Sequence, residues 1–266
     1  MVFVAFWLAM APVASAQTAD QILERYFKAA GGLDRLRALS SLRITGVMTL
    51  ESGEDVHYVT EKARPNRMRM EIRSGGMTGV QAYDGKIAWS FLPQRGEKQA
   101  TTVPDPQDVG LIAADADFDG PFIDWPRKAI KLERLEDDDF DGHPVFKLRM
   151  VKNTGRTEIF YVDRKTSQVI GSKIRDIVGR DMVYTTRTQS DFRVVGGLTF
   201  PFRVVERRSN TDKVRTIQIS RIELNPPLDP SRFAFPGTAA PDAAKGTAPA
   251  PAKPARAAPD STPAKP

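Results

Sequence analysis

Residues 67–73 read Arg-Met-Arg-Met-Glu-Ile-Arg, and this stretch decides the fold class of the chain. Met68, Met70 and Ile72 alternate with charged residues, so an extended strand places every apolar side chain on one face and every charge on the other. The same period of two runs through residues 42–50 and 55–63. The stretch therefore predicts a β-sheet with one apolar face, of the kind that antiparallel strands form.

Further segments follow this pattern, and Gly, Pro, Asn or Asp residues separate them. Gly196-Gly197 joins two of the segments as a two-residue hairpin turn. The sequence predicts a mainly β (α+β) fold, a large curved antiparallel sheet or incomplete β-barrel of about 10–11 strands. Besides the three stretches above, the predicted strands are 87–91, 129–135, 145–151, 157–162, 169–174, 182–195, 198–205 and 214–224.

Helices are predicted at two places. After Thr18, apolar residues recur at helical spacing up to Gly31-Gly32, and residues 33–39 form a second short helix. Residues 104–126 mix turn residues with large apolar ones. They are either a short helical flap that covers the concave face of the sheet or a long crossover loop that closes the core.

Composition divides the chain into three segments. Residues 1–16 are uncharged, largely apolar and end in Ala14-Ser15-Ala16, which indicates a cleaved signal peptide. Residues 17–236 are long enough for one large β domain. Residues 237–266 contain Ala, Pro, Lys, Thr and Asp but no aromatic residue and no Val, Ile or Leu, so we expect a disordered tail.

Charge and cysteine content exclude several classes of protein. Between the two ends the chain has 35 Lys and Arg against 31 Asp and Glu, and this small excess is spread along the strands. Nucleic-acid binding is a poor interpretation, because no basic helix or aromatic-basic motif is present. The absence of cysteine excludes disulfides, thiolate nucleophiles and cysteine metal sites. We expect no cofactor.

Flexible apolar side chains suggest a lipid-binding cavity. The thioether chain of methionine is flexible and polarisable, which suits a lining that must adapt to acyl chains. Ligand pockets are typically apolar with few polar groups. An ordinary sheet core would use the same residues, so both interpretations stay open. The candidate lining residues are Met48, Met68, Met70, Trp89, Phe91, Phe146, Leu148 and Met150.

Catalysis and metal binding have weaker support. His57 and His143 are the only histidines, and no nucleophile elbow, HExxH or phosphate loop is present. Residues 115–120 and 137–142 resemble the start of a calcium loop, but Pro126 and Leu148 stand where a bidentate Glu is required. We therefore expect no metal site and no enzyme.

Several motifs, in this order and spacing, resemble the outer-membrane lipoprotein-sorting (Lol lipoprotein carrier-like) proteins. The resemblance implies a curved antiparallel sheet whose concave face is covered by helices and encloses an apolar cavity for acyl chains. The motifs are QILERYFKAAGGL at 21–33, LRITG at 42–46, DGHPVFKL at 141–148, YVDRKT at 161–166 with Val169-Ile170, DFRVVGGLTFPF at 191–202, and NPPLD at 225–229 with Phe233.

Three functions follow as hypotheses. The first is a monomeric periplasmic carrier of lipoprotein or lipid acyl chains, which takes part in outer-membrane lipoprotein sorting or lipid transfer and meets transfer proteins of the inner and outer membranes. The second is a sensor of envelope lipids or stress that regulates a membrane partner. The third is a hydrolase that uses acid pairs such as Asp137 and Asp139.

The leader gives the first testable prediction. If signal peptidase cuts after Ala16, N-terminal sequencing of the exported protein will find Gln17, or its cyclised form, as the first residue. Recovery of the protein from the cytoplasm with Met1 still in place would contradict the predicted periplasmic location.

Overall fold

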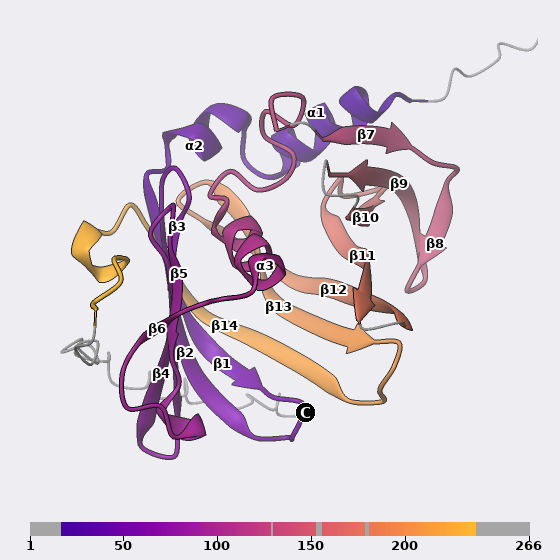
Figure 1. The fold of residues 1–266 in the computed structure, drawn as a ribbon. Coiled ribbons are helices and arrows are strands. Elements are labelled where there is room, and N and C mark those ends of the chain that lie inside the picture. Colours follow the sequence, from indigo (N-terminus) through magenta and orange to yellow (C-terminus); the bar gives the residue numbers. More distant parts are fainter. Residues whose placement is uncertain (1–16, 129, 153–155, 179–180, 238–266) are drawn as a thin grey trace, which may run out of the picture.

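One antiparallel sheet, curved but not closed, forms the body of the molecule (Figure 1). The computed structural model describes residues 17–128, 130–152, 156–178 and 181–237. The order of the strands is β6-β5-β4-β3-β2-β1-β14-β13-β12-β11-β10-β9-β7, and β8 pairs with β9. The strands are β1 Ser41–Thr49, β2 Asp55–Ala63, β3 Arg67–Ser74, β4 Met77–Tyr83, β5 Ala88–Phe91, β6 Thr101–Thr102, β7 Lys131–Arg134, β8 Asp138–Phe140, β9 His143–Val151, β10 Thr157–Asp163, β11 Val169–Val178, β12 Asp181–Val195, β13 Leu198–Arg208 and β14 Val214–Leu224.

The predicted fold class is confirmed, with three more strands than expected. Strand β4 contains Gly79 and follows Gly75-Gly76, and glycine weakens the strand signal. Strand β6 is two residues long, and β8 begins with two aspartates, which are rare in strands. The Gly196-Gly197 hairpin is confirmed, and its two positive φ angles are those that such a tight turn needs.

Two helices cross one end of the sheet: α1 Ala19–Ala29 and α2 Leu33–Ala38 (Figure 1). Helix α1 begins with a capping box, in which the Thr18 and Gln21 side chains each bond to the other's backbone N–H. Between the helices, Gly31 has a φ of 107° and lies against Gly197, whose carbonyl oxygen would be 2.1 Å from any added Cβ. Glycine therefore lets the helical end seat directly on the β12–β13 hairpin.

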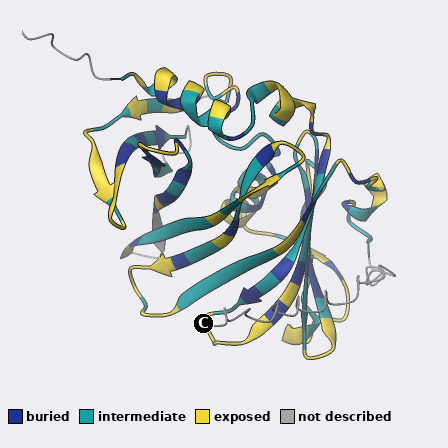
Figure 2. Ribbon diagram, turned by 180° about the vertical axis from the view of Figure 1, so that it is seen from behind, coloured by how far each residue is buried: buried dark blue, intermediate teal, exposed yellow. Residues whose placement is uncertain are grey.

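A third helix, α3 Pro106–Ala116, lies inside the curve of the sheet and packs on β3, β4 and β5 (Figure 1). Asp105 caps it by accepting a hydrogen bond from the backbone N–H of Gln107. Turns follow over residues 117–128, which we call the flap. The helical interpretation of residues 104–126 is thus the one the structure adopts. In Figure 2 exposed residues gather at the hairpin turns, whereas buried ones lie along the strands.

The outer face of β2, β3 and β5 is also covered. Residues 226–236, with the 3₁₀ turn η2 Pro230–Arg232, fold back over this face, and we call them the clasp (Figure 1). The indole Nε1 of Trp89 donates to the carbonyl oxygen of Phe233 at 2.9 Å, and both side chains are fully buried. The charged face of residues 67–73 therefore lies beneath a second layer, with Arg69 and Glu71 buried.

Ion pairs neutralise the charges under the clasp. Arg69 Nε lies 2.8 Å from Glu71 Oε1, and Arg69 Nη1 donates to the Arg232 carbonyl at 3.0 Å. Arg232 also pairs with Glu61 at 2.8 Å, and Arg43 approaches the other oxygen of Glu61 at 3.0 Å. Buried charges need such partners, since an unpaired one is costly to desolvate. The clasp therefore completes the outer wall of this half of the sheet.

The second prediction separates the clasp from the tail. Replacing Phe233 with Ala should lower the free energy of unfolding by about 3–5 kcal/mol, because a fully buried ring leaves a cavity. A chain that ends at Pro236 should melt as the full chain does, since residues 237–266 contribute no large apolar side chain. Thermal melting checks both variants. A large fall in melting temperature on truncation would show that residues 238–266, which lie outside the described residues, pack against the β domain.

Candidate functional site

The inner face of the sheet, the side on which Met68 lies, is the candidate binding site. Met68 stands opposite Lys62 of β2 and Tyr83 of β4, so these three side chains share the inner face. Helix α3 covers one side of this face, and α1 with the flap covers the other. The inner face thus carries apolar clusters beneath separate covers.

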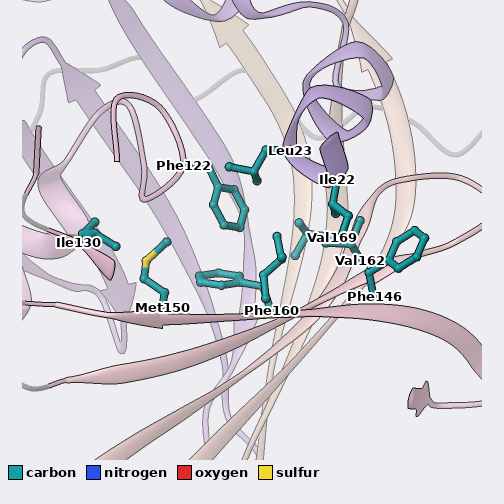
Figure 3. Packing of buried hydrophobic residues seen from close by; sticks show 10 residues of the cluster. Ile22, Leu23, Phe122, Ile130, Phe146, Met150, Phe160, Val162 and Val169 are labelled. Carbon is teal, nitrogen blue, oxygen red and sulfur yellow. The ribbon is translucent and has the colours of Figure 1, made fainter. Parts of the chain in front are cut away.

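The structure brings six of the eight predicted lining residues to the inner face. Phe146, Leu148 and Met150 of β9 belong to a cluster with Ile22 and Leu23 of α1 and Phe122 of the flap (Figure 3). The Phe122 and Phe160 rings meet edge to face, with centroids 4.7 Å apart. The flap, α1 and the sheet therefore contribute side chains to one apolar cluster.

The three other inner residues, Met48, Met68 and Met70, are distributed over the β1–β3 side. Met68 packs with Ile112 and Ala116 of α3. Met48 lies in a separate cluster with Val56 and Tyr58. Met70, opposite Thr60 and Gln81, is only partly buried. The apolar lining thus consists of separate clusters with a partly open region at Met70.

Trp89 and Phe91 are not on the inner face. Trp89 stands opposite Ala82, which stands opposite Arg69, so it shares the outer face with the buried charges. Phe91 packs in the same outer cluster, together with Phe235 of the clasp. Both residues therefore support the clasp and do not line the inner face.

A small apolar cavity of about 150 Å³ lies between the helical end, the flap and the sheet. Sequence reasoning missed it, because its walls come from five separate segments; the only signal was the apolar content of α1 and the flap. Ligand pockets usually measure about 300–1,000 Å³, so this cavity is smaller than a binding site of ordinary size. Its lining is Tyr26, Phe27, Leu36, Leu39, Leu42, Phe118, Asp119, Gly120, Pro121, Phe122, Ile123 and Phe200.

Arg64, at the end of β2, ties the flap to the helical end. Its guanidinium donates to the carbonyl oxygens of Leu39 and, at 3.1 Å, of Leu36. Nη1 lies 2.5 Å from Asp119 Oδ1, and the guanidinium carbon is 4.7 Å from the centre of the Phe118 ring. One partly exposed side chain thus joins α2, the flap and the sheet.

Other polar contacts of the flap are local or exposed. Lys128 Nζ lies 2.6 Å from Asp117 Oδ2 within the flap, and Arg37 of α2 pairs with Asp124 at 2.7 Å. Partly exposed ion pairs are screened by salt and contribute little stability. Asp117 and Asp119, which belong to the first calcium-like stretch, are therefore engaged with Lys128 and Arg64.

A polar band crosses the inner face between the apolar clusters. Glu206 of β13, which is buried, accepts from Arg187 of β12 at 2.7 Å and from Arg215 of β14. Burial alone would raise the pKa of the Glu206 carboxyl, but the two guanidiniums outweigh it and the pKa lies below its usual value. Burial also lowers the pKa of Lys62, although the negative charges of Asp115 and Asp117 act in the opposite direction and raise it. Part of the inner face is thus polar, and its Glu206 carboxylate is held by two arginines.

The histidines do not belong to this face. His57 is exposed, and His143 Nδ1 lies 3.3 Å from Asp163 Oδ2 at the edge of the turn after β10. Among the residues that the structure describes, no group of three potential metal ligands is found. Within the same residues, no helix combines the length and the apolar character that crossing a bilayer requires.

Solved structures share this architecture. A LolA superfamily protein from Nitrosomonas europaea aligns with a TM-score of 0.58 and 13% identity, over 82% of this chain and 98% of its own. A putative outer membrane lipoprotein-sorting protein domain from Vibrio parahaemolyticus aligns at 0.54 and 11%, over 80% and 94%. A DUF1329 family protein from Desulfovibrio piger aligns at 0.57 and 13%, over 82% and 99%.

Sequence comparison adds no relative to these. No family model matches the chain, and no curated protein matches it. At such identities the likeness concerns the fold. The open sheet, the inner helix and the helical end together show that this chain has the fold of the LolA superfamily and of lipoprotein-sorting domains, as the motifs predicted.

Proposed function

We propose that the protein is a periplasmic carrier that binds the acyl chains of lipoproteins or lipids on the inner face of its sheet. The observation that carries this proposal is an apolar inner face covered by separate pieces, α1, α3 and the flap, that contact the sheet chiefly through side chains. A fold shared with a lipoprotein-sorting domain supports the same function.

The lining suits a chain without polar groups. The inner clusters are formed mainly by Met, Phe, Leu, Ile, Val and Ala side chains, which make few directional contacts, together with Tyr58 and Tyr83. Each methylene moved from water into such a surface contributes about 0.8 kcal/mol, so affinity grows with the length of chain buried. Methionines on both sides of Met70 allow the surface to adapt to different chains.

Binding requires the covers to move. The cavity of about 150 Å³ is too small for an acyl chain of ordinary length, so the ligand has to displace apolar side chains of the flap or of α3. In our proposal the ligand replaces contacts such as Phe122 against Phe160, and an apolar surface remains covered in both states. Partly exposed contacts, including those of Arg64, hold the flap and can be released without leaving a deeply buried charge.

The polar band limits where the chain lies. Arg187, Glu206 and Arg215 occupy the inner face of β12–β14. An acyl chain placed over them would displace water from these charged groups without offering them hydrogen bonds in return. We therefore place acyl chains along the apolar clusters on either side of the band. Mass spectrometry of gently purified protein, with lipid extraction, tests whether acyl ligands accompany it; transfer to a second protein then distinguishes a carrier from a sensor.

The third prediction concerns Met70. Replacing Met70 with Trp in a tight core would cost about 1–3 kcal/mol, whereas the partly open inner face should accept the ring with less loss. If the indole displaces about two methylenes of a bound chain, a fluorescent fatty-acyl probe will bind about tenfold more weakly.

A matched variant, His57→Trp, places the same ring on the exposed outer face of β2 and should leave probe binding unchanged. Thermal melting and probe titration measure both variants. Unfolding of Met70→Trp, together with no probe binding by the wild type, would make the inner face a closed core.

The fourth prediction concerns Arg64. In the variant Arg64→Gln the flap loses its ion pair with Asp119, and α2 loses the bond to its Leu36 carbonyl, so we expect a loss of about 1–3 kcal/mol in flap stability. Amide hydrogen exchange over residues 117–124 should accelerate about tenfold or more, and the acyl probe should associate faster.

Arg37→Gln is the matched control, because its pair with Asp124 is half-exposed and contributes about 0–1 kcal/mol. Faster exchange in both variants alike would mean that Arg64 has no special part in holding the flap. Unchanged exchange with Arg64→Gln would mean that apolar packing alone holds it.

A further inference from the structure

The outer face of β11–β14 carries a group of cations that the carrier function does not use. Lys173 and Arg175 of β11 and Arg203 and Arg207 of β13 are all exposed. They alternate with inward residues such as Ser172 and Glu206, so all four side chains start from the outer face. We call these four residues the basic face.

The register of the strands brings the four cations together. Lys173 and Arg207 stand on either side of Thr186, one strand away in each direction, so their backbones are about 10 Å apart. Arg203 lies on the same strand as Arg207, four residues earlier and therefore about 13 Å away. The positive charges therefore lie within a small area of a regular sheet surface.

Among the described residues these four cations have no acidic partner, unlike the arginines that neutralise the buried glutamates of the sheet. On the inner face, Arg187 and Arg215 share Glu206, and beneath the clasp Arg43 pairs with Glu61. Lys173 instead lies over the Tyr184 ring, with Nζ 4.7 Å from its centre.

Two carboxylates at the margins of the basic face are already engaged. Asp191 of β12 is held by Arg193 through two contacts, of 2.9 and 2.7 Å. Asp138, on the β8 hairpin, pairs with Lys147 at 2.8 Å. These two carboxylates therefore do not neutralise the basic face, whose positive charge can attract an external anion.

Hydroxyl groups occupy positions between the cations. Thr186 and Thr188 of β12 and Thr216 of β14 share the outer face with the four cations, and their hydroxyls can donate to phosphate oxygens. The centre of a protein–protein interface is usually depleted of charge and rich in aromatic residues. Val205 and Tyr184 also lie on this face, but cations and hydroxyls surround them, which favours a surface of phosphate groups.

We propose that the basic face docks on a lipid bilayer that carries anionic phospholipid headgroups. Charge complementarity carries this inference, and it needs no acyl ligand on the inner face. Helix α3 and the flap lie on the other side of the sheet, so docking by the outer face leaves both free to move (Figure 1). The contact weakens with salt, because surface charges are screened within about 8–10 Å at physiological ionic strength.

Co-sedimentation of the full chain with vesicles tests the proposal. We expect binding to vesicles that contain phosphatidylglycerol, loss of binding with rising salt, and little binding to phosphatidylcholine alone. Each cation near an anionic surface contributes about fivefold in affinity, so the double variant Arg203→Gln, Arg207→Gln should bind about 25-fold more weakly.

A second double variant, Arg95→Gln with Lys98→Gln, removes the same charge from exposed residues beside β6 and should bind as the wild type does. Both variants share all other residues with the wild type, so any contribution of the two ends of the chain is common to them. An equal loss of vesicle affinity in the two double variants would overturn the proposal, as would a wild type that does not bind anionic vesicles. Capture by polyglutamate without vesicle binding would assign the face to an acidic protein instead.

Fluorescent-probe titration in solution keeps the two proposals apart. The Arg203→Gln, Arg207→Gln variant should bind the fatty-acyl probe as the wild type does, since both residues lie on the outer face. Loss of vesicle docking with intact probe binding is the expected result. Loss of both would place these arginines in the support of the inner face and contradict the separation that we propose.

Discussion

A curved sheet that does not close cannot cover its own inner face, and this constraint accounts for most other features of the molecule. A closed barrel of this size would bury its lining by packing side chains across the interior. Here β6 and β7 end the sheet on opposite sides, so helices and the flap must shield the apolar clusters. Covers that are separate from the sheet can leave it without breaking strand pairing, because their contacts are chiefly between side chains.

The two halves of the sheet use their outer faces differently. Around Glu61, Arg69 and Trp89, strands β2, β3 and β5 are buried on both faces, since the clasp covers this part of their outer side with Arg232 and Phe233. Strands β11 and β13 carry exposed cations on the same side, where the Phe140 ring of β8 covers Gly171 but leaves the cations exposed. One half is therefore covered on both sides at the clasp, whereas the other presents a charged surface to solvent, with a polar band on its inner face.

The period of two was enough to predict the class of fold, the hairpin at Gly196-Gly197 and the inner placement of Met68, because alternation is a local property. It did not reveal that Arg69 and Glu71 are buried, since their cover comes from residues some 160 positions later. Trp89 was assigned to the wrong side of the sheet for a related reason: strand register after a hairpin decides the face, and β4 had not been recognised. The cavity combines five distant segments, which no periodicity reports.

The positions of the tryptophans give the protein a built-in optical signal. Trp7 lies outside the described residues, and within them the tryptophans are Trp89 and Trp125. Trp89 is fully buried beneath the clasp, where its indole is bonded to the Phe233 carbonyl, whereas Trp125 lies in the flap and packs partly buried against the cluster under α1. Movement of the flap would alter the emission of Trp125 alone, and the steady emission of Trp89 would serve as the internal reference in the same molecule.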